Sequence, residues 1–379
     1  MINDFYKKAI ELHKEHHGKI EVISKVKLDN KEALSAAYSP GVAEVVREIA
    51  KDESLAYEYT LKRNTVAIVS DGSAILGLGN LGAKASIPVM EGKAAIFKEF
   101  AGIDAFPICL DTQDKDEIIK AVKQIAPVFG GINLEDIASP KCFEIEEILR
   151  KELDIPVMHD DQWGAATATL AAFINSIKLR GLNKEEVKVV LSGVGAAGVA
   201  TGRLLISYGA KNIIFCDSKG IIHKGRNDLN KEKLELLNGS CAKVNEGTLE
   251  DAIFGTNVFI GLSKPNILTK EMIQKMAEKP IIFALANPDP EILPSLAYES
   301  GAFIVATGRS DYPNQINNSL VFPGAFKGML DNRIPQFNND VFIKIAEALA
   351  SYVKDVSTEK ILPSMFDRGV AEEVAKLMK

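Results

Sequence analysis

Short apolar, β-branched runs alternate with amphipathic stretches through the first half of the chain. Residues 1–20 predict a polar amphipathic helix. Apolar runs that end at turn or acidic residues predict strands over 65–70, 105–110, 126–130 and 155–159. The spacing between them predicts helices over 114–125, 140–153 and 164–180. A strand–helix–strand order of this kind is typical of a mostly parallel sheet.

The same pattern starts again after Gly181. It predicts a helix over 196–208 and strands over 187–192, 212–216, 258–261, 280–284 and 302–306. Residues 338–378 are predicted to be helical, with a break at Pro363. We therefore predict an α/β protein with an N-terminal α/β domain (1–163), a Rossmann-type doubly wound parallel-sheet domain (164–330) and a C-terminal helical segment (331–379).

Composition and charge narrow the class of protein. The chain has 379 residues and a net charge of −6, which does not suit a nucleic-acid binder. Its four cysteines form no CxxC pair, and no membrane span or signal peptide is apparent. We expect a cytoplasmic protein that binds neither nucleic acid nor membranes.

The pattern GxGxxG occurs twice, and only the second copy has suitable surroundings. It follows a predicted strand, opens a predicted helix and precedes a strand that ends in an acid. In dinucleotide-binding folds such glycines admit the pyrophosphate and the acid accepts ribose hydroxyls. The alternative is a glycine turn in an α/β fold that binds another ligand. The predicted cofactor residues here are Gly193, Val194, Gly195, Ala196, Ala197, Gly198 and Asp217.

The first copy, over 77–82, is interpreted as a loop that needs close backbone approach. Pro88 is expected to interrupt a helix there. For the second copy, Asp217 favours NAD because an acid repels the 2′-phosphate of NADP. Lys219 lies two residues later and would offset that repulsion, so NAD or NADP is predicted, with NAD favoured.

Two acidic pairs, Glu135–Asp136 and Asp160–Asp161, stand at the ends of predicted strands. Ligands of open α/β sheets bind at that edge. Hard oxygen donors without a histidine–cysteine set suit Mg²⁺ or Mn²⁺. We predict Glu135, Asp136 and Asp161 as metal ligands and Asp160 as their supporting partner. The alternative is that Asp161 only caps the following helix.

Lys93 and Tyr38 are the candidates for proton transfer. Lys93 is predicted to lie in the first turn of a helix, where the dipole and a nearby cation would lower its pKa and yield a neutral amine base. Tyr38 precedes a Pro-Gly turn that would hold the phenol at a fixed angle. A surface lysine and a packing tyrosine are the alternatives.

Several long segments of the chain carry a resemblance to one known family. They are AAYSPGVAE (36–44), ILGLGNLG (75–82), PVMEGKAAIFKEFAGID (88–104), INLEDI (132–137), HDDQWGAATA (159–168), GVGAAG (193–198), FCDSKG (215–220), FALANPDPE (283–291) and ATGRSDYPNQINNSLVFPG (306–324). Together they resemble the malic enzyme family in its short prokaryotic form, from Tyr38 to about Gly328. The resemblance implies oxidative decarboxylation of (S)-malate to pyruvate and CO₂, with NAD or NADP and with Mg²⁺ or Mn²⁺. It also implies a substrate domain before the Rossmann domain, with the C-terminal helices folded back on the first.

The resemblance also implies roles for individual residues. Lys93 matches the base that takes the proton of the malate hydroxyl, and Tyr38 matches the acid that protonates the enolate. The other matches are the metal ligands Glu135, Asp136 and Asp161, and the amides Asn287 and Asn318 near nicotinamide and substrate, with Asn317 as the fallback for Asn318.

One segment departs from the larger members of the family. They carry an arginine for the malate carboxylate after the Asp-Gly turn, whereas residues 71–75 here contain none. Ser73 or backbone amides are then the candidates for this contact. The alternative functions are a malolactic enzyme and a catalytically inactive nucleotide-binding regulatory protein. A homodimer or larger homo-oligomer is expected, and whether Tyr38 and Lys93 of one site come from one chain or two stays open.

Overall fold

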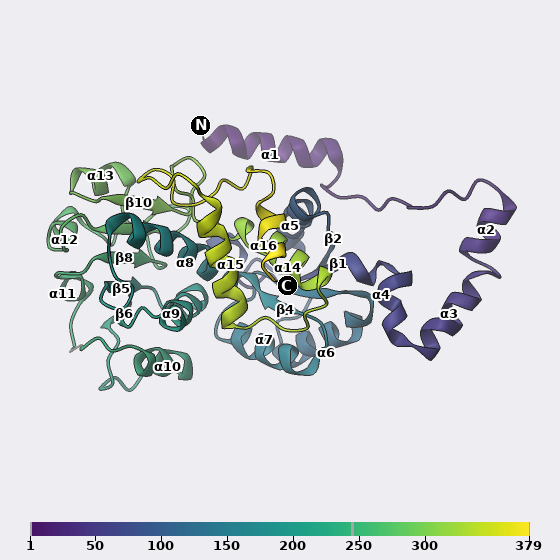
Figure 1. Cartoon of the computed structure of the whole chain (residues 1–379), viewed down its shortest axis with the longest axis horizontal. Helices are drawn as coiled ribbons and strands as arrows, with labels where there is room; N and C mark the ends of the chain where they lie inside the picture. The colour runs from purple at the N-terminus through teal and green to yellow at the C-terminus, as the bar shows by residue number, and fades with distance from the viewer. Residues whose placement is uncertain (1, 244–245, 379) are drawn as a thin grey trace.

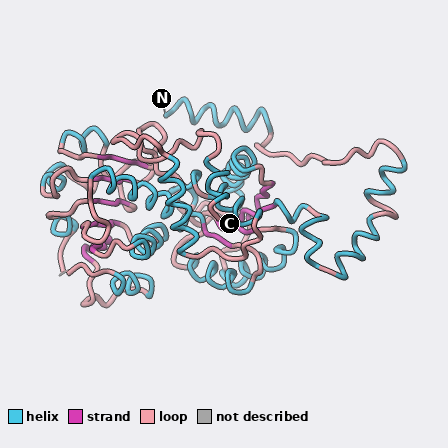
Figure 2. The backbone as a smooth tube through the Cα atoms, viewed as in Figure 1, coloured by secondary structure: helices cyan, strands magenta, loops and turns pink. Residues whose placement is uncertain are grey.

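A computed structural model describes residues 2–243 and 246–378. It contains two separate sheets with helices packed around them and a long N-terminal arm that extends away from both (Figures 1 and 2). The sheets are parallel except at one edge. This architecture confirms the predicted α/β class with a Rossmann-type sheet.

The first sheet has the strand order β2-β1-β3-β4. All six residues of β1 are buried, as expected for a central parallel strand that is covered on both faces. Because the strands are parallel, they all end at one edge, and the loops there can meet. The elements are β1 (Thr65–Ser70), α5 (Ala83–Ala101), β2 (Asp104–Cys109), α6 (Lys115–Ile125), β3 (Gly131–Leu134), α7 (Lys141–Glu152), β4 (Val157–His159) and α8 (Asp160–Arg180).

The second sheet has the order β10-β9-β8-β5-β6-β7, in which β7 alone is antiparallel to its neighbour. The order reverses between β5 and β8, and dinucleotides bind at such switch points. The elements are β5 (Lys188–Ser192), α9 (Ala196–Tyr208), β6 (Asn212–Asp217), β7 (Gly220–Ile221), α10 (Lys231–Gly239), α11 (Leu249–Ile253), β8 (Val258–Gly261), α12 (Lys270–Gln274), β9 (Ile281–Ala284), α13 (Pro294–Glu299) and β10 (Ile304–Thr307).

Three C-terminal helices, α14 (Phe322–Asp331), α15 (Asn339–Tyr352) and α16 (Val370–Lys376), join the two sheets. α14 and α16 pack against α5, while α15 packs against α8 and α9. The rings of Phe97 and Phe322 lie 4.7 Å apart at this contact. None of the helices in the described residues is long and apolar enough to span a membrane.

The N-terminal arm carries α1 (Ile2–His16), α2 (Lys31–Ala37) and α3 (Val42–Lys51), and α4 (Ala56–Tyr59) leads from it into the first sheet. α2 and α3 lie far from both sheets in Figure 1. Every residue of these two helices is described, and none of them is buried. These two helices therefore contribute no buried side chain to a hydrophobic core.

Three predicted elements are wrong. Residues 126–128 form a 3₁₀ turn rather than a strand, and the strand follows at β3, because Pro127 suits the first turn of a helix and cannot donate to a sheet. α5 runs through Pro88, since packing on β1 and β2 outweighs the lost hydrogen bond. Residues 338–378 are helical only in α15 and α16.

Candidate active site

An acidic cluster lies at the carboxyl edge of the first sheet. Glu135 and Asp136 follow β3, and Asp161 lies in the first turn of α8 directly after β4. One carboxylate oxygen from each of these three residues lies within 4.8 Å of the other two. Asp136 has a φ of 53°, in the left-handed region, so the chain turns sharply there. This turn lets two neighbouring acids face one point.

Lys93 reaches into the cluster from the middle of α5. Its Nζ lies 2.5 Å from Glu135 Oε2 and 2.5 Å from Asp160 Oδ2, and 4.5 Å from the ring centre of Phe322. Only 7% of Lys93 is exposed. Burial alone would lower the pKa of Lys93, but the charges of Asp160 and Glu135 outweigh burial and raise it. The expected position in a first helical turn is therefore wrong. The side chains alone raise the pKa of Lys93, and its lowering by a nearby cation stays a prediction.

The carboxylates of the cluster crowd one another. Burial, reinforced by Asp161, raises the pKa of Asp136 to about 7. Burial also raises the pKa of both Glu135 and Asp160, against the opposing charge of Lys93. Asp136 Oδ2 and Asp160 Oδ1 are buried and accept no hydrogen bond from the described residues. Buried, unpartnered hard oxygens fit a divalent cation such as Mg²⁺ or Mn²⁺.

Several contacts hold the cluster together that the sequence did not single out. Asn133, which is fully buried in β3, donates from Nδ2 to Glu135 Oε2 at 3.1 Å. The backbone N–H of Asp136 donates to Asp161 Oδ2 at 2.8 Å. A polar residue inside an apolar strand was the available signal for Asn133, because a buried amide requires hydrogen-bond partners.

The two candidate asparagines after β10 behave differently. Asn318 donates from Nδ2 to Asp160 Oδ2 at 2.5 Å, which joins the second domain to the cluster. Asn317 instead accepts the backbone N–H of Ser319 and caps the short 3₁₀ turn Asn318–Leu320. The structure thus brings Asn318 to the acids and uses Asn317 locally.

Ser73 makes internal hydrogen bonds. Its hydroxyl donates to Asp71 Oδ1 at 2.6 Å and accepts the backbone N–H of Ala138 at 2.9 Å. Asp71 in turn forms an ion pair with Lys141. Ser73 therefore ties the loop after β1 to the loop after β3.

Tyr38 lies elsewhere. It follows α2 on the extended arm, and 68% of it is exposed. Figure 1 shows α2 on the far side of the first sheet from the body of the second. The structure of one chain does not bring Tyr38 together with Lys93.

The dinucleotide loop lies between β5 and α9, as its sequence pattern requires. Gly193 has a φ of +100°, and a Cβ there would lie 2.3 Å from the carbonyl oxygen of Leu262. A Cβ on Gly198 would lie 1.9 Å from the carbonyl oxygen of Gly193. Around Gly195 there is open space, so a ligand can approach its backbone. Ala196 packs against the core of the first sheet, which brings the loop close to that domain.

Asn287, by contrast, is exposed on the loop after β9. It lies against Gly308, where a Cβ would come within 2.8 Å of Asn287 Nδ2. The described residues show no contact between Asn287 and the acidic cluster.

Asp217, at the end of β6, is surrounded by cations. Arg226 donates two hydrogen bonds to its carboxylate, at 2.8 and 2.9 Å, and Lys233 donates one at 2.7 Å. Burial opposes this effect, but these bonds lower the pKa of Asp217 to about 2. Lys219, which was expected to offset the repulsion of a 2′-phosphate, donates from Nζ to Asp228 at 2.7 Å. Arg226 and Lys233 were not predicted, because only the folded loop brings them back to Asp217.

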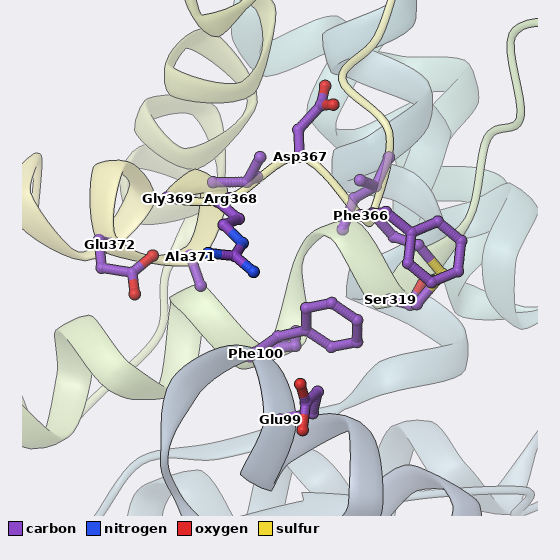
Figure 3. A pocket seen from close by; sticks show the side chains of 13 residues that line it. Glu99, Phe100, Ser319, Phe366, Asp367, Arg368, Gly369, Ala371 and Glu372 are labelled. Atoms are coloured by element: carbon purple, nitrogen blue, oxygen red, sulfur yellow. The ribbon is translucent and has the colours of Figure 1, made fainter.

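A pocket of about 460 Å³ lies between the end of α5 and the segment that leads into α16, and none of the cluster acids lines it. Figure 3 shows the Arg368 side chain within it, above Phe100 of α5. Phe366, at its rim, is 77% exposed.

The comparisons with known proteins identify the family of the chain. Residues 17–150 match the family model "Malic enzyme, N-terminal domain", and residues 163–378 match "Malic enzyme, NAD binding domain". The chain is 52% identical over 371 residues to a bifunctional malic/malolactic enzyme of Bacillus subtilis (strain 168), covering 97% of this chain and 90% of that protein. It is 53% identical over 362 residues to an NAD-dependent malic enzyme of Geobacillus stearothermophilus, covering 94% and 75%.

A solved structure supports the same assignment. The crystal structure of an NAD-dependent malic enzyme from Thermotoga maritima superimposes with a TM-score of 0.95 at 49% identity, covering 98% of each chain. Sequence similarity and fold extend over both domains. On this basis the chain belongs to the malic enzyme family.

Proposed function

We propose that the chain catalyses the metal-dependent oxidative decarboxylation of (S)-malate to pyruvate and CO₂, with reduction of NAD or NADP. One observation carries this proposal: a buried lysine contacts Asp160 and also Glu135, which is one of three acids that face one point. A hydroxy-acid oxidation needs a base, and loss of CO₂ needs a positive group where charge develops. The cluster offers both within one site.

Glu135, Asp136 and Asp161 would hold a Mg²⁺ or Mn²⁺ ion. When bound, such an ion supplies Lewis-acid stabilisation for the negative charge that develops as CO₂ leaves. Asp160 accepts hydrogen bonds from Lys93 and from Asn318, so it fixes both side chains beside these ligands. Asp160 is thereby a partner of the site rather than a fourth ligand.

Lys93 is the proposed base for the malate hydroxyl. The surrounding carboxylates raise the pKa of Lys93, so it accepts a proton only when their negative charge is compensated. A divalent cation on the three acids provides that compensation. The base and the metal site therefore depend on each other.

Tyr38 is the proposed acid that protonates the enolate carbon, and we propose that a second copy of the chain supplies it. The arm exposes apolar side chains on two short helices, with Leu34 at 48%, Tyr38 at 68% and Val46 at 60%. Helices this short are unstable in water without a partner, and such exposed apolar surface is typical of an interface. A homodimer or larger homo-oligomer follows from this proposal.

NAD is the proposed preferred cofactor, with NADP also accepted. Asp217 is ionised and lies at the end of β6, where an acid accepts ribose hydroxyls. Arg226 and Lys233 lie against it and offer positive charge for a 2′-phosphate. These opposing charges support use of both nucleotides.

A malolactic activity is the second candidate. It uses the same residues and yields lactate without net reduction of the cofactor. The Bacillus subtilis relative, described as a bifunctional malic/malolactic enzyme, favours it as a side activity.

The test is an assay of the purified chain with (S)-malate, Mn²⁺ and either nucleotide, with pyruvate, lactate and reduced cofactor all measured. We expect pyruvate and reduced cofactor in equal amounts, and no turnover after chelation of the metal. Lactate without reduced cofactor would support the malolactic reaction instead. Absence of turnover with both nucleotides would contradict the proposal.

A further inference from the structure

Glu146 is a buried acid of α7 whose single carboxylate accepts three hydrogen bonds from the start of α8. Only 4% of Glu146 is exposed. Its Oε1 accepts the backbone N–H of His159 at 2.9 Å. Its Oε2 accepts Gln162 Nε2 at 3.0 Å and Trp163 Nε1 at 2.9 Å. One side chain thus fixes three residues of a neighbouring segment.

These three residues lie on both sides of the acids of the cluster. His159 directly precedes Asp160, and Gln162 directly follows Asp161. His159 is the N-cap of α8, and its own side chain makes no capping hydrogen bond. The first helical turn is therefore held from another helix rather than by a local cap.

The charge of Glu146 is needed for this arrangement. The nearest cation is Arg150, whose Nη1 lies 4.0 Å from Glu146 Oε1, beyond hydrogen-bond distance. Burying a carboxylate without a close cation is costly unless both oxygens accept hydrogen bonds. A glutamine in place of Glu146 has only one accepting oxygen, so its NH₂ group would face an N–H donor at the start of α8.

We infer that Glu146 is a positioning residue for the metal site: it orients Asp161 and Asp160 by fixing the backbone and side chains next to them. It touches neither the three-acid set nor Lys93 in the contacts that the described residues make. Groups behind metal ligands set the direction of those ligands and thereby their affinity for the ion. The inference rests on the metal role proposed above for Asp161.

The test compares Mn²⁺ binding by Glu146→Gln and by the unaltered full-length chain, with free Mn²⁺ measured by electron paramagnetic resonance. We expect the Mn²⁺ dissociation constant to rise about 10- to 100-fold, as for other groups that support metal ligands. The dissociation constant for NAD should stay unchanged. Unchanged Mn²⁺ affinity in Glu146→Gln would overturn the inference, whatever happens to thermal stability.

Glu291→Gln is the matched control. Glu291 is fully buried in the second domain and accepts the backbone N–H groups of Ser263 and Ala286, each at 3.0 Å. Like Glu146→Gln, Glu291→Gln removes a buried carboxylate that accepts hydrogen bonds, but Glu291 does not contact α8. The Mn²⁺ affinity of Glu291→Gln should equal that of the unaltered chain. An equal rise of the Mn²⁺ dissociation constant in Glu146→Gln and Glu291→Gln would show a general effect of lost stability and overturn the inference.

Gln162→Leu covers the case in which Glu146→Gln fails to fold. It removes one donor and keeps the carboxylate, so we expect a smaller rise in the Mn²⁺ dissociation constant; no rise would count against the inference.

Asp161→Asn separates the proposed metal site from the proposed role of Glu146. If Asp161→Asn still binds Mn²⁺ tightly, Asp161 is not a metal ligand and the proposed metal site is contradicted. If Asp161→Asn loses Mn²⁺ binding while Glu146→Gln binds Mn²⁺ normally, only the role of Glu146 is contradicted.

Discussion

The acidic cluster and the N-terminal arm each carry one of the two proposed proton-transfer residues, yet they are built in opposite ways. Lys93 is 7% exposed and contacts two carboxylates, while Tyr38 is 68% exposed at the end of a helix with no buried residue. The position of Lys93 is determined by the fold of its own chain. The position of Tyr38 is not, and our proposal that a second copy supplies it makes one half of the site complete in one chain and the other half dependent on a partner.

This difference follows from how the two regions are stabilised. α5 packs against the first sheet and against the C-terminal helices, so many contacts fix Lys93. α3 has its apolar side chains in solvent, and association is the way to bury them. Substitutions in the cluster should therefore act on chemistry within one chain, and those in the arm on assembly as well.

The largest expected effect is that of Lys93→Ala. Removing a base of this kind typically costs about 10²- to 10⁴-fold in rate, and we expect a loss at the upper end of this range because the acids also lose their partner. The measurement is kcat for pyruvate formation with saturating Mn²⁺. Lys98→Ala is the control, since Lys98 lies on the same helix but pairs at the surface with Asp104. Comparable loss in both variants would contradict a special role for Lys93.

Tyr38→Phe should cost about 10²-fold in kcat, because it removes one proton donor and keeps the ring. The oligomeric state should not change, since the apolar area stays. Tyr59→Phe is the control on the same part of the chain, where Tyr59 is 52% exposed. If Tyr38→Phe retains full turnover, the phenol is not the acid and the arm serves assembly alone.

The acids of the cluster give it a pH dependence that the arm should lack. The pKa of Asp136 is raised to about 7, so its carboxyl group takes up a proton as the pH falls below 7 and loses its value as a ligand. Mn²⁺ affinity should fall by about 10-fold per pH unit below that value. Titrations of the full chain between pH 5 and 8, at about equal ionic strength, check this. A flat profile would contradict the combination of a raised pKa and a ligand role for Asp136.

Val46→Asp tests the arm alone and has the smallest expected effect on the cluster. It places a charge on the exposed apolar face of α3, where Val46 is 60% exposed, and should raise the dimer dissociation constant about 10-fold or more. Sedimentation at several concentrations measures this change. Val22→Asp, in the extended segment before α2, is the control. Mn²⁺ affinity should stay unchanged in both, and loss of Mn²⁺ binding in Val46→Asp would contradict the independence of the two regions.

The sequence predicted the elements with strong local signals. β1 and α9 have the predicted bounds, because a run rich in β-branched residues and a glycine turn leave few alternatives. The start of α5 was missed because Pro88 suggests a break that packing overrides.

Which site residues lie together in the fold was harder to predict from the sequence. Strand ends indicated that Glu135, Asp136 and Asp161 could meet, since parallel strands end at one edge. The contacts of Lys93 with Asp160 and Glu135 were missed because these acids lie 67 and 42 residues further along the chain and converge only after folding. The exposure of Tyr38 was equally hidden, because no local pattern tells a docked helix from one that awaits a partner.

Mixed dimers test the central claim most directly. A Lys93→Ala chain and a Tyr38→Phe chain, co-expressed with different tags and purified as mixed dimers, each supply the residue that the other lacks. If the arm of one chain completes the cluster of the other, one site of two is intact and kcat should reach about half of the unaltered value in a symmetric dimer. Mixed dimers no more active than either variant alone would contradict the account.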